Sequence, residues 1–216
     1  MLLSLTKSQL ESIFKDLAKQ LKSKLRGNNF SYELIIVGGA SILLNYSFRM
    51  STIDIDCLDV NDALMNEVVN EVGEKHNLPN GWINTDFIKT NSYTPKLIQY
   101  SSFYKSYSNG TLVIRTIKDE YLVAMKMVAA RNYQHDISDI YGIIVENKRI
   151  TFEAIEKAII DLYGSLNIVE NRVIEFVKDI FINPSIRYID IKNEEDKNKE
   201  VLIEKIQTKR KTKPGS

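Results

Sequence analysis

One stretch, residues 35–60, constrains the fold of this chain more than any other. It reads IIVGGASILLNYSFRMSTIDIDCLDV. A short apolar run leads into Gly38 and Gly39, a short helical segment follows, and a second strand-like run carries Asp54 and Asp56. Successive side chains of a strand point to opposite faces. We therefore expect the two aspartates to share one face and the apolar residues around them to share the other.

The glycine pair has the properties of a phosphate-binding turn. Gly38 and Gly39 carry no side chain, so the backbone can approach a phosphate closely. A helix that starts at this point presents free N–H groups to an anion. Ser41 can add a hydroxyl. We therefore predict that Gly38, Gly39 and Ser41 cradle the phosphates of a nucleotide.

The aspartate pair has the properties of a metal site. A nucleotide triphosphate carries Mg²⁺, which prefers hard oxygen ligands and keeps several waters. Asp54 and Asp56, aimed from one strand face at one point, supply such ligands, and two metal ions held this way can align an attacking and a leaving oxygen. A second carboxylate on that face favours a metal-bound triphosphate over a dinucleotide fold, in which one acidic residue binds a ribose.

Composition narrows the class of protein. The 216 residues carry a net charge of +1, so any anion site must be local. Cys57 is the only cysteine, which excludes an intramolecular disulfide and suits a reducing compartment. No apolar run approaches the roughly 20 residues of a membrane span, and no Cys/His zinc set is present. We expect a soluble, cytoplasmic protein with no membrane contact.

Apolar periodicity predicts a mixed sheet domain followed by helices. Residues 1–116 are expected to form the sheet domain with an N-terminal helix, residues 117–183 a helical subdomain, and residues 184–216 a charged, flexible tail. Trp82 is expected to be a core anchor. The expected helices cover residues 6–26, 40–48, 61–76, 118–131, 136–146, 151–163 and 168–181, and the expected strands residues 33–37, 52–59, 82–90 and two strands within 96–116 joined at 108–110.

Four segments together resemble a known superfamily. They are VGGASILL at residues 37–44, RMSTIDID at 49–56, WINTD at 82–86 and YLVAMKMVAARNYQHDISDI at 121–140. The arrangement resembles the polymerase-beta-type nucleotidyltransferases, and is most similar to the type IV toxin-like nucleotidyltransferases of bacterial abortive-infection systems. The resemblance covers roughly residues 30–145.

The resemblance implies a fold, a reaction and further site residues. The fold class is α/β (α+β), a nucleotidyltransferase-like small mixed sheet flanked by helices. The reaction is Mg²⁺-dependent transfer of a nucleotide from an NTP to a hydroxyl of RNA, such as tRNA, or of a protein, in a toxin with an antitoxin partner. Arg49 and Lys126 would contact the nucleotide phosphates. Asp86 is the candidate third carboxylate, with Thr85 as the alternative occupant of that position.

Other interpretations remain open. Lys126 and Arg131 lie five residues apart and diverge by about 140° on a helix, so they can instead form ordinary ion pairs with Asp136 or Asp139, which cap and brace the next helix. The fold can also serve as a catalytically weak nucleotide-binding or partner-binding module, with too few carboxylates for turnover. A third possibility is an interaction protein that assembles through the apolar helices of residues 151–181. Oligomeric state does not follow from the sequence.

Overall fold

A computed structural model of the protein describes residues 4–26, 30–58, 62–183 and 188–211. The chain forms two compact units, Met1–Leu122 and Val123–Ser216, and the helix α4 (Asp119–Ala129) contains the boundary between them. No helix in the described ranges combines the length and the apolar character needed to cross a membrane.

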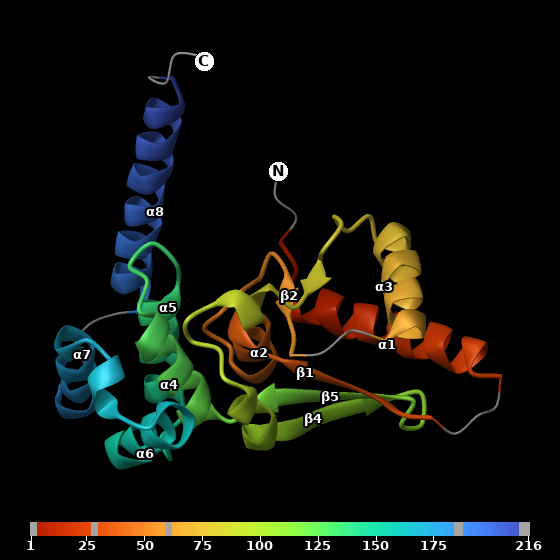
Figure 1. The fold of residues 1–216 in the computed structure, drawn as a ribbon, viewed down its shortest axis with the longest axis horizontal. Coiled ribbons are helices and arrows are strands. Elements are labelled where there is room, and N and C mark those ends of the chain that lie inside the picture. The colour runs from red at the N-terminus through yellow and green to blue at the C-terminus, as the bar shows by residue number, and fades with distance from the viewer. Residues whose placement is uncertain (1–3, 27–29, 59–61, 184–187, 212–216) are drawn as a thin grey trace. The chain divides into compact units, whose positions relative to one another are not determined.

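The first unit holds both groups of strands (Figure 1). Its helices and 3-10 helices are α1 (Lys7–Lys24), α2 (Gly38–Asn45), α3 (Ala63–Lys75), η1 (Asp86–Lys89) and η2 (Pro95–Tyr100). Its strands are β1 (Tyr32–Ile36), β2 (Ile55–Asp56), β3 (Ile83–Asn84), β4 (Ser101–Tyr107) and β5 (Leu112–Ile117). The α+β fold class predicted from the sequence, a small mixed sheet with helices, is confirmed.

The main sheet has the order β1-β5-β4, with β1 parallel and β4 antiparallel to the central strand β5. The predicted hairpin turn joins β4 to β5, and Ser108, Asn109 and Gly110 all adopt positive φ there. Asparagine and glycine tolerate this left-handed region better than other residues do, which is why Asn-Gly predicts such turns. The strands β2 and β3 form a second, parallel pair.

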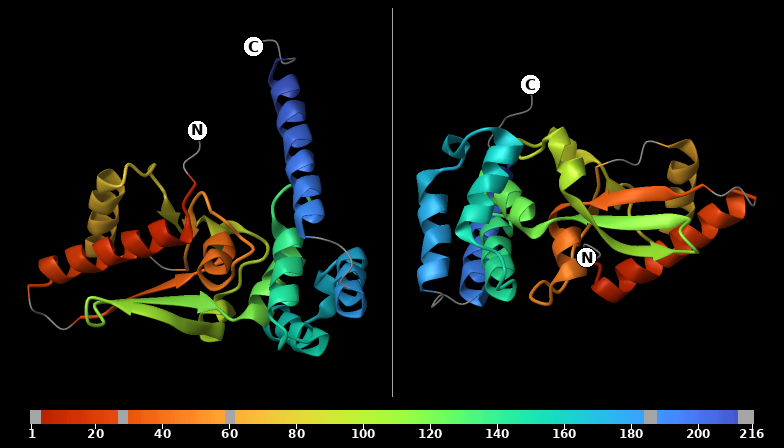
Figure 2. Two further views of the ribbon diagram at one scale, coloured as in Figure 1. Left: turned by 180° about the vertical axis from the view of Figure 1, so that it is seen from behind. Right: turned by 90° about the horizontal axis from the view of Figure 1, so that it is seen from below.

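The helix α1 supplies much of the core under the sheet. The sequence offers two possible capping boxes at its start, Thr6 with Gln9 and Ser8 with Glu11, and the structure forms the first. One face of α1 is fully buried and lies along β4 and β5 (Figures 1 and 2). Phe14 on this face meets the ring of Tyr107 with the two centroids 6.1 Å apart. Apolar side chains at helical spacing thus place α1 against the sheet, as expected for an amphipathic helix.

Two of the predicted strands are much shorter than expected. The strand predicted over residues 52–59 is reduced to β2, and residue 59 lies outside the described residues. The strand predicted over residues 82–90 is wrong beyond β3, because the chain turns into η1 at Asp86. Trp82, just before β3, is buried as predicted and donates a hydrogen bond from Nε1 to the Val69 carbonyl oxygen over 3.2 Å.

The second unit is helical. It contains the end of α4, then α5 (Asp136–Glu146), α6 (Phe152–Tyr163), the 3-10 turn η3 (Leu166–Ile168), α7 (Asn171–Ile182) and α8 (Tyr188–Lys211). Thr151 caps α6 through a hydrogen bond from the Ala154 N–H, and Gly164 ends that helix in the left-handed conformation. The helical character predicted from residue 118 onward is therefore found in the structure.

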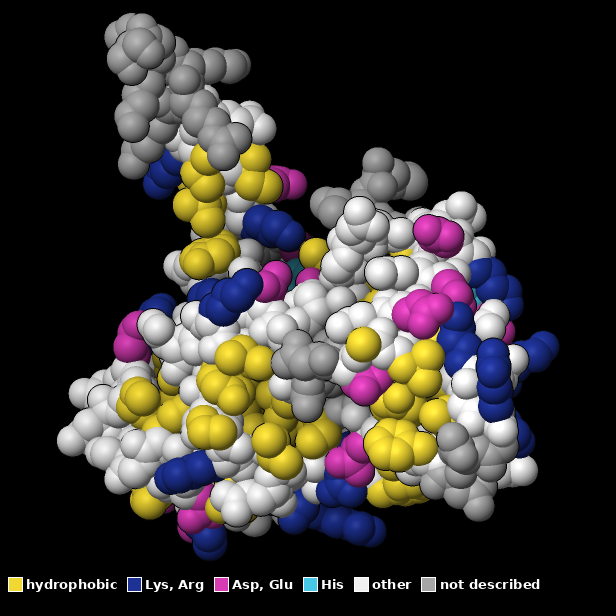
Figure 3. Space-filling view, turned by 45° about the vertical axis from the view of Figure 1, so that its right-hand side comes forward, with side chains coloured by type: hydrophobic (Ala, Val, Ile, Leu, Met, Phe, Trp, Pro, Cys, Tyr) yellow, Lys and Arg dark blue, Asp and Glu magenta, His cyan; other side chains and the backbone are white. Residues whose placement is uncertain are grey.

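The flexible tail predicted for residues 184–216 is wrong over the length of α8. Residues 184–187 and 212–216 lie outside the described residues, but residues 188–211 form a helix. Hydrophobic side chains are exposed along it, among them Val201, Ile203 and Ile206 (Figure 3). The charged composition of α8 did not predict that Ile191 and Glu195 are buried. These two residues dock the first turns of α8 on α5.

Glu195 explains how a charged helix can be docked. Its Oε1 accepts hydrogen bonds from the Ile137 N–H over 2.8 Å and the Ser138 N–H over 3.3 Å, and its Oε2 accepts one from the Ser138 hydroxyl over 2.5 Å. The first N–H groups of a helix have no partner within that helix. Glu195 therefore caps α5 from another helix, a long-range contact that no local sequence pattern encodes.

Replacement of Glu195 by glutamine should remove a pH dependence of stability. Burial, with the negative charge of Asp139 adding to it, raises the pKa of Glu195 from 4.5 to about 7. The folded protein thus holds this proton more tightly than the unfolded chain does. Its stabilising contribution is complete below pH 4.5 and is lost as pH rises through about 7. The free energy of unfolding of the wild type and of Glu195→Gln is measured by urea denaturation as a function of pH. Between pH 5 and pH 8, the wild type should lose on the order of 2 kcal/mol of this free energy relative to the variant.

Glu200→Gln is the matched control for this measurement. Glu200 is exposed on the same helix, so its neutral variant should keep the wild-type pH dependence. Parallel pH profiles of the wild type and Glu195→Gln would contradict the assignment.

Candidate functional site

The end of β1 and the strand β2 are joined by two backbone hydrogen bonds. The Val37 N–H donates to the Asp56 carbonyl oxygen over 2.9 Å, and the Leu58 N–H donates to the Ile35 carbonyl oxygen over 3.0 Å. The glycine turn that follows β1 therefore lies beside Asp56 of β2. The sequence predicted that these two motifs meet, and the backbone places them together.

Both glycines leave room for a charged side chain. Gly38 has a φ of +59°, and a Cβ built on it would lie 3.2 Å from the Asp56 Oδ2. A Cβ on Gly39 would lie 2.5 Å from the Arg49 Nη2. The Arg49 side chain also donates from Nε to the Ser51 carbonyl oxygen over 3.3 Å. The first turn of α2 thus has a carboxylate on one side and a guanidinium on the other.

The aspartates alternate with buried apolar residues. Ile55 and Cys57 are fully buried, while Asp54 and Asp56 are half-buried on the opposite face, as predicted. The expectation fails at Ile53, which is half exposed because the chain bends before β2 begins. Asp54 and Asp56 are therefore both partly open to solvent, on either side of the buried Ile55.

The ionisation of Asp54 reflects competing effects. Burial raises its pKa above the ordinary value, and the negative charge of Asp86 acts in the same direction. The positive charge of Arg49 and a hydrogen bond from Asn84 oppose the rise. Arg49 thus contacts the turn at Gly39 and also stabilises the ionised form of Asp54.

Asn84 is a site residue that sequence reasoning missed. It lies opposite Asp56 in the parallel pairing of β2 and β3. Its side chain hydrogen-bonds Asp54, and its Oδ1 accepts the Asp86 N–H over 2.8 Å. Because the amide oxygen of Asn84 accepts from Asp86, the amide nitrogen is the group that can donate to Asp54. Asn84 therefore serves to orient Asp54. Only the pairing of residues 55–56 with residues 83–84 could have identified Asn84 as a site residue.

Asp86 does not occupy the position predicted for a third carboxylate on a strand. It begins η1, its side chain is 73% exposed, and its Oδ1 accepts from the Lys89 Nζ over 2.6 Å. Across the described part of the chain, no three His, Cys, Asp or Glu side chains lie close enough together to hold a metal ion jointly. Asp86 contributes a negative charge near Asp54, and its direct role in catalysis stays a prediction.

Ser41 lies in α2 but is closed to solvent. Its side chain is fully buried, and its hydroxyl has no hydrogen-bond partner within the described residues. Buried hydroxyls usually have one. The predicted contact between Ser41 and phosphate requires α2 to open, and it stays a prediction.

The donor set fits one magnesium ion better than two. Mg²⁺ is commonly held by one or two carboxylates, with phosphate oxygens and waters in the remaining positions. Asp54 and Asp56 provide two carboxylates beside the glycine turn, where the close approach of Gly38 to Asp56 leaves no side chain in the way. A two-metal site would require a further carboxylate at this face.

Lys126 lies in the second unit, where it forms ion pairs with two carboxylates of the protein itself. Its Nζ lies 2.7 Å from the Asp136 Oδ1 and 3.0 Å from the Asp139 Oδ2, and both aspartates are fully buried. Asp136 and Asp139 lie in the first turn of α5. A phosphate would have to compete with two buried carboxylates for Lys126.

The expected divergence of Lys126 and Arg131 is wrong. The helix α4 ends at Ala129, and Ala130 has a φ of +37°. Arg131 therefore turns back, and its Nε donates to the Asp136 Oδ2 over 2.8 Å. Burial alone would raise the pKa of Asp136, but the charges of Lys126 and Arg131 hold it at about 2. The structure therefore shows the ion pairs of Lys126 and Arg131 that the sequence analysis gave as the alternative interpretation of this segment.

Comparison with known proteins gives one match. A family model described as "Nucleotidyltransferase of unknown function (DUF6036)" matches residues 11–195. No curated protein and no solved structure matches the chain.

A side chain at Gly39 should displace Arg49. The added methyl group of Gly39→Ala would overlap the flexible end of the Arg49 side chain, which can move at little cost in stability. Asp54 would then lose the positive charge that lowers its pKa, so that pKa should rise further. The measurement is a carboxyl-carbon NMR titration of Asp54. Gly110→Ala is the control: its φ of +87° makes the substitution strained, but no atom lies within 4 Å of the added Cβ, so it should leave the Asp54 titration unchanged. An unchanged titration in Gly39→Ala would show that Arg49 does not act on Asp54.

Removal of the Lys126 charge should destabilise the second unit. Lys126→Met leaves Asp136 and Asp139 buried with one cation fewer, and breaking such a buried pair costs about 3–5 kcal/mol. Chemical denaturation measures this loss. The control is Lys157→Met, which breaks an exposed i,i+4 pair with Asp161 and should cost less than about 1 kcal/mol. Equal stability of the two variants would contradict a structural role for Lys126.

Proposed function

The chain belongs to this family of nucleotidyltransferases, and we propose that it transfers a nucleotide from an Mg²⁺-bound NTP to an acceptor hydroxyl. Family membership supports nucleotidyl transfer in general. The choice of metal, the roles of individual residues and the acceptor are part of the proposal.

The observation that carries the proposal is the approach of Gly38 to Asp56. It puts the N-terminal turn of α2, which has no side-chain cap, next to the Asp56 carboxylate of β2. Free backbone N–H groups attract phosphate, and carboxylates attract its magnesium ion. A metal-bound triphosphate needs both within a few ångströms. Arg49, over Gly39, adds positive charge at the same turn.

In the proposed reaction, Asp54 and Asp56 would hold the metal ion, which would neutralise charge on the phosphates. Gly38 and Gly39 hold the triphosphate through their N–H groups. The acceptor oxygen attacks the α-phosphorus, the new O–P bond forms, and the bond to the leaving pyrophosphate breaks. We assign the proton of the acceptor hydroxyl to one of the two carboxylates, Asp54 or Asp56. Asn84 keeps the Asp54 carboxylate oriented through its hydrogen bond.

We further propose a macromolecular acceptor, either RNA such as tRNA or a protein hydroxyl. This step rests on the resemblance of the segments around Gly38, Asp54 and Lys126 to the abortive-infection toxin-like nucleotidyltransferases. The same resemblance supports a role as a toxin with an antitoxin partner. Growth arrest on expression of the wild type, relieved by the inactive variants described below, is the expected outcome for a toxin.

A second candidate function is nucleotide binding without transfer. The specific observation in its favour is Asn84, a neutral side chain at the position opposite Asp56 where a third acid would complete a two-metal site. Such a module would bind Mg²⁺-NTP and release it unchanged.

Label transfer from NTPs distinguishes the two functions. The full chain is incubated with Mg²⁺, the four α-labelled NTPs and either total RNA or total protein. Asp54→Asn and Asp56→Asn should each lower transfer by about 10²–10³-fold, since each removes several kcal/mol of charge stabilisation from the transition state. Asp86→Asn should lower it by less than about tenfold, because Asp86 is exposed and paired with Lys89.

The result is interpretable only if the variants fold, which thermal denaturation of each will show. Equal transfer by an Asp54→Ala, Asp56→Ala double variant would sink the mechanism. Binding of Mg²⁺-NTP by the wild type without transfer to either acceptor pool would select the second function. A loss with Asp86→Asn as large as with Asp54→Asn would restore Asp86 as the third carboxylate.

A further inference from the structure

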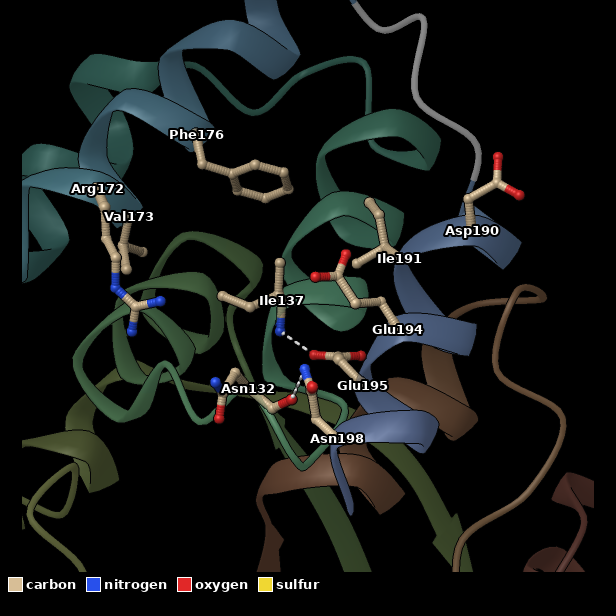
Figure 4. A pocket seen from close by; sticks show the side chains of 10 residues that line it. All are labelled: Asn132, Ile137, Arg172, Val173, Phe176, Asp190, Ile191, Glu194, Glu195 and Asn198. Carbon is tan, nitrogen blue, oxygen red and sulfur yellow. Dashed lines mark hydrogen bonds between the residues drawn. The ribbon is translucent and has the colours of Figure 1, made fainter. Parts of the chain in front are cut away.

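A cavity of about 340 Å³ lies among α5, α7 and α8 in the second unit (Figure 4). Ligand pockets in proteins commonly measure about 300–1,000 Å³. The proposed transfer chemistry uses none of the residues that line this cavity. Its size suffices for a small molecule or for one large side chain.

Apolar side chains from all three helices form one part of the lining. Val173 and Phe176 come from α7, Ile137 from α5 and Ile191 from α8. Val173 and Ile191 are buried, whereas Phe176 is half-buried and presents its ring to the cavity in Figure 4. This lining favours a ligand with a hydrocarbon body.

The polar part of the lining is negatively charged. The helix α8 contributes Asp190, Glu194 and Glu195. Glu195 is already engaged with the first N–H groups of α5. The one cationic lining residue, Arg172, donates from Nε to the Glu170 Oε2 over 2.5 Å. A ligand therefore meets an excess of carboxylate.

Glu194 is the carboxylate available to a ligand. In Figure 4 it extends from α8 into the cavity, towards Ile137 and Phe176. Its neighbour Glu195 lies along the floor with its hydrogen bond to Ile137 drawn. Within the described residues, no hydrogen bond or ion pair of Glu194 is recorded. A carboxylate and an aromatic ring that face one space are together suited to a cation, since the face of the ring also attracts positive charge.

We propose that this cavity binds a small organic cation, a primary amine or guanidine attached to an apolar body. The charged head lies between Glu194 and the ring of Phe176, and the body packs on Val173 and Ile191. The same carboxylates repel phosphate, so the ligand is not the nucleotide, and the proposal stands independently of the proposed function. Because the lining joins α5, α7 and α8, the ligand stabilises the docking of α8.

A charge series with one common body tests the proposal. The probes are phenethylamine, 2-phenylethanol and 3-phenylpropionate, which place a cation, a neutral hydroxyl and an anion on a similar phenylalkyl body. Binding to the full chain is followed by NMR shifts of Phe176 and Ile191. Phenethylamine should bind at least about tenfold more tightly than the other two, and should raise the melting temperature by mass action.

Glu194→Gln should weaken phenethylamine binding about threefold to fivefold, as expected for loss of one ionic contact near the surface. Glu200→Gln, on the exposed side of the same helix, should bind it as the wild type does. Circular dichroism of both variants controls for the folding of α8. Equal binding of the three probes, no binding of phenethylamine, or unchanged binding by Glu194→Gln would each overturn the proposal.

Discussion

The two backbone hydrogen bonds between the end of β1 and β2 determine where the candidate chemistry of the first unit lies. They bring Val37 within 2.9 Å of the Asp56 carbonyl oxygen and leave Gly38 next to the Asp56 side chain. At that separation, and with a φ of +59°, a side chain at residue 38 would be strained and would crowd the carboxylate. The glycine therefore permits the turn and leaves the Asp56 carboxylate uncrowded.

The features that could be predicted from the sequence are those set by local rules. Alternation placed Ile55 and Cys57 in the core with Asp54 and Asp56 on the other face. The Asn-Gly signal placed the hairpin, and the capping box placed the start of α1. Such features depend on neighbours within a few residues, so a single sequence carries them.

The features that could not be predicted depend on contacts between distant segments. Asn84 enters the site through a two-residue strand pair whose register is set by packing, and the same short pairing leaves Asp86 on a 3-10 turn. The helix α8 looked like a solvated tail because its one buried acid, Glu195, finds its partners on another helix. Lys126 and Arg131 converge because Ala130 adopts a positive φ, which no sequence pattern predicts.

Local charge, rather than the whole molecule's field, selects what each site can hold. A net charge of +1 gives almost no long-range steering of ligands. In the first unit, Arg49 and the N-terminal turn of α2 offset the aspartates, so that a phosphate can approach together with its metal ion. In the second unit, the one cation among the described residues that line the cavity, Arg172, is already paired, and the carboxylates are in excess. At physiological salt, charges further apart than about 8 Å are largely screened. Each site must therefore discriminate by direct contact, which makes individual charged side chains decisive: Arg49 in the first unit and Glu194 in the second.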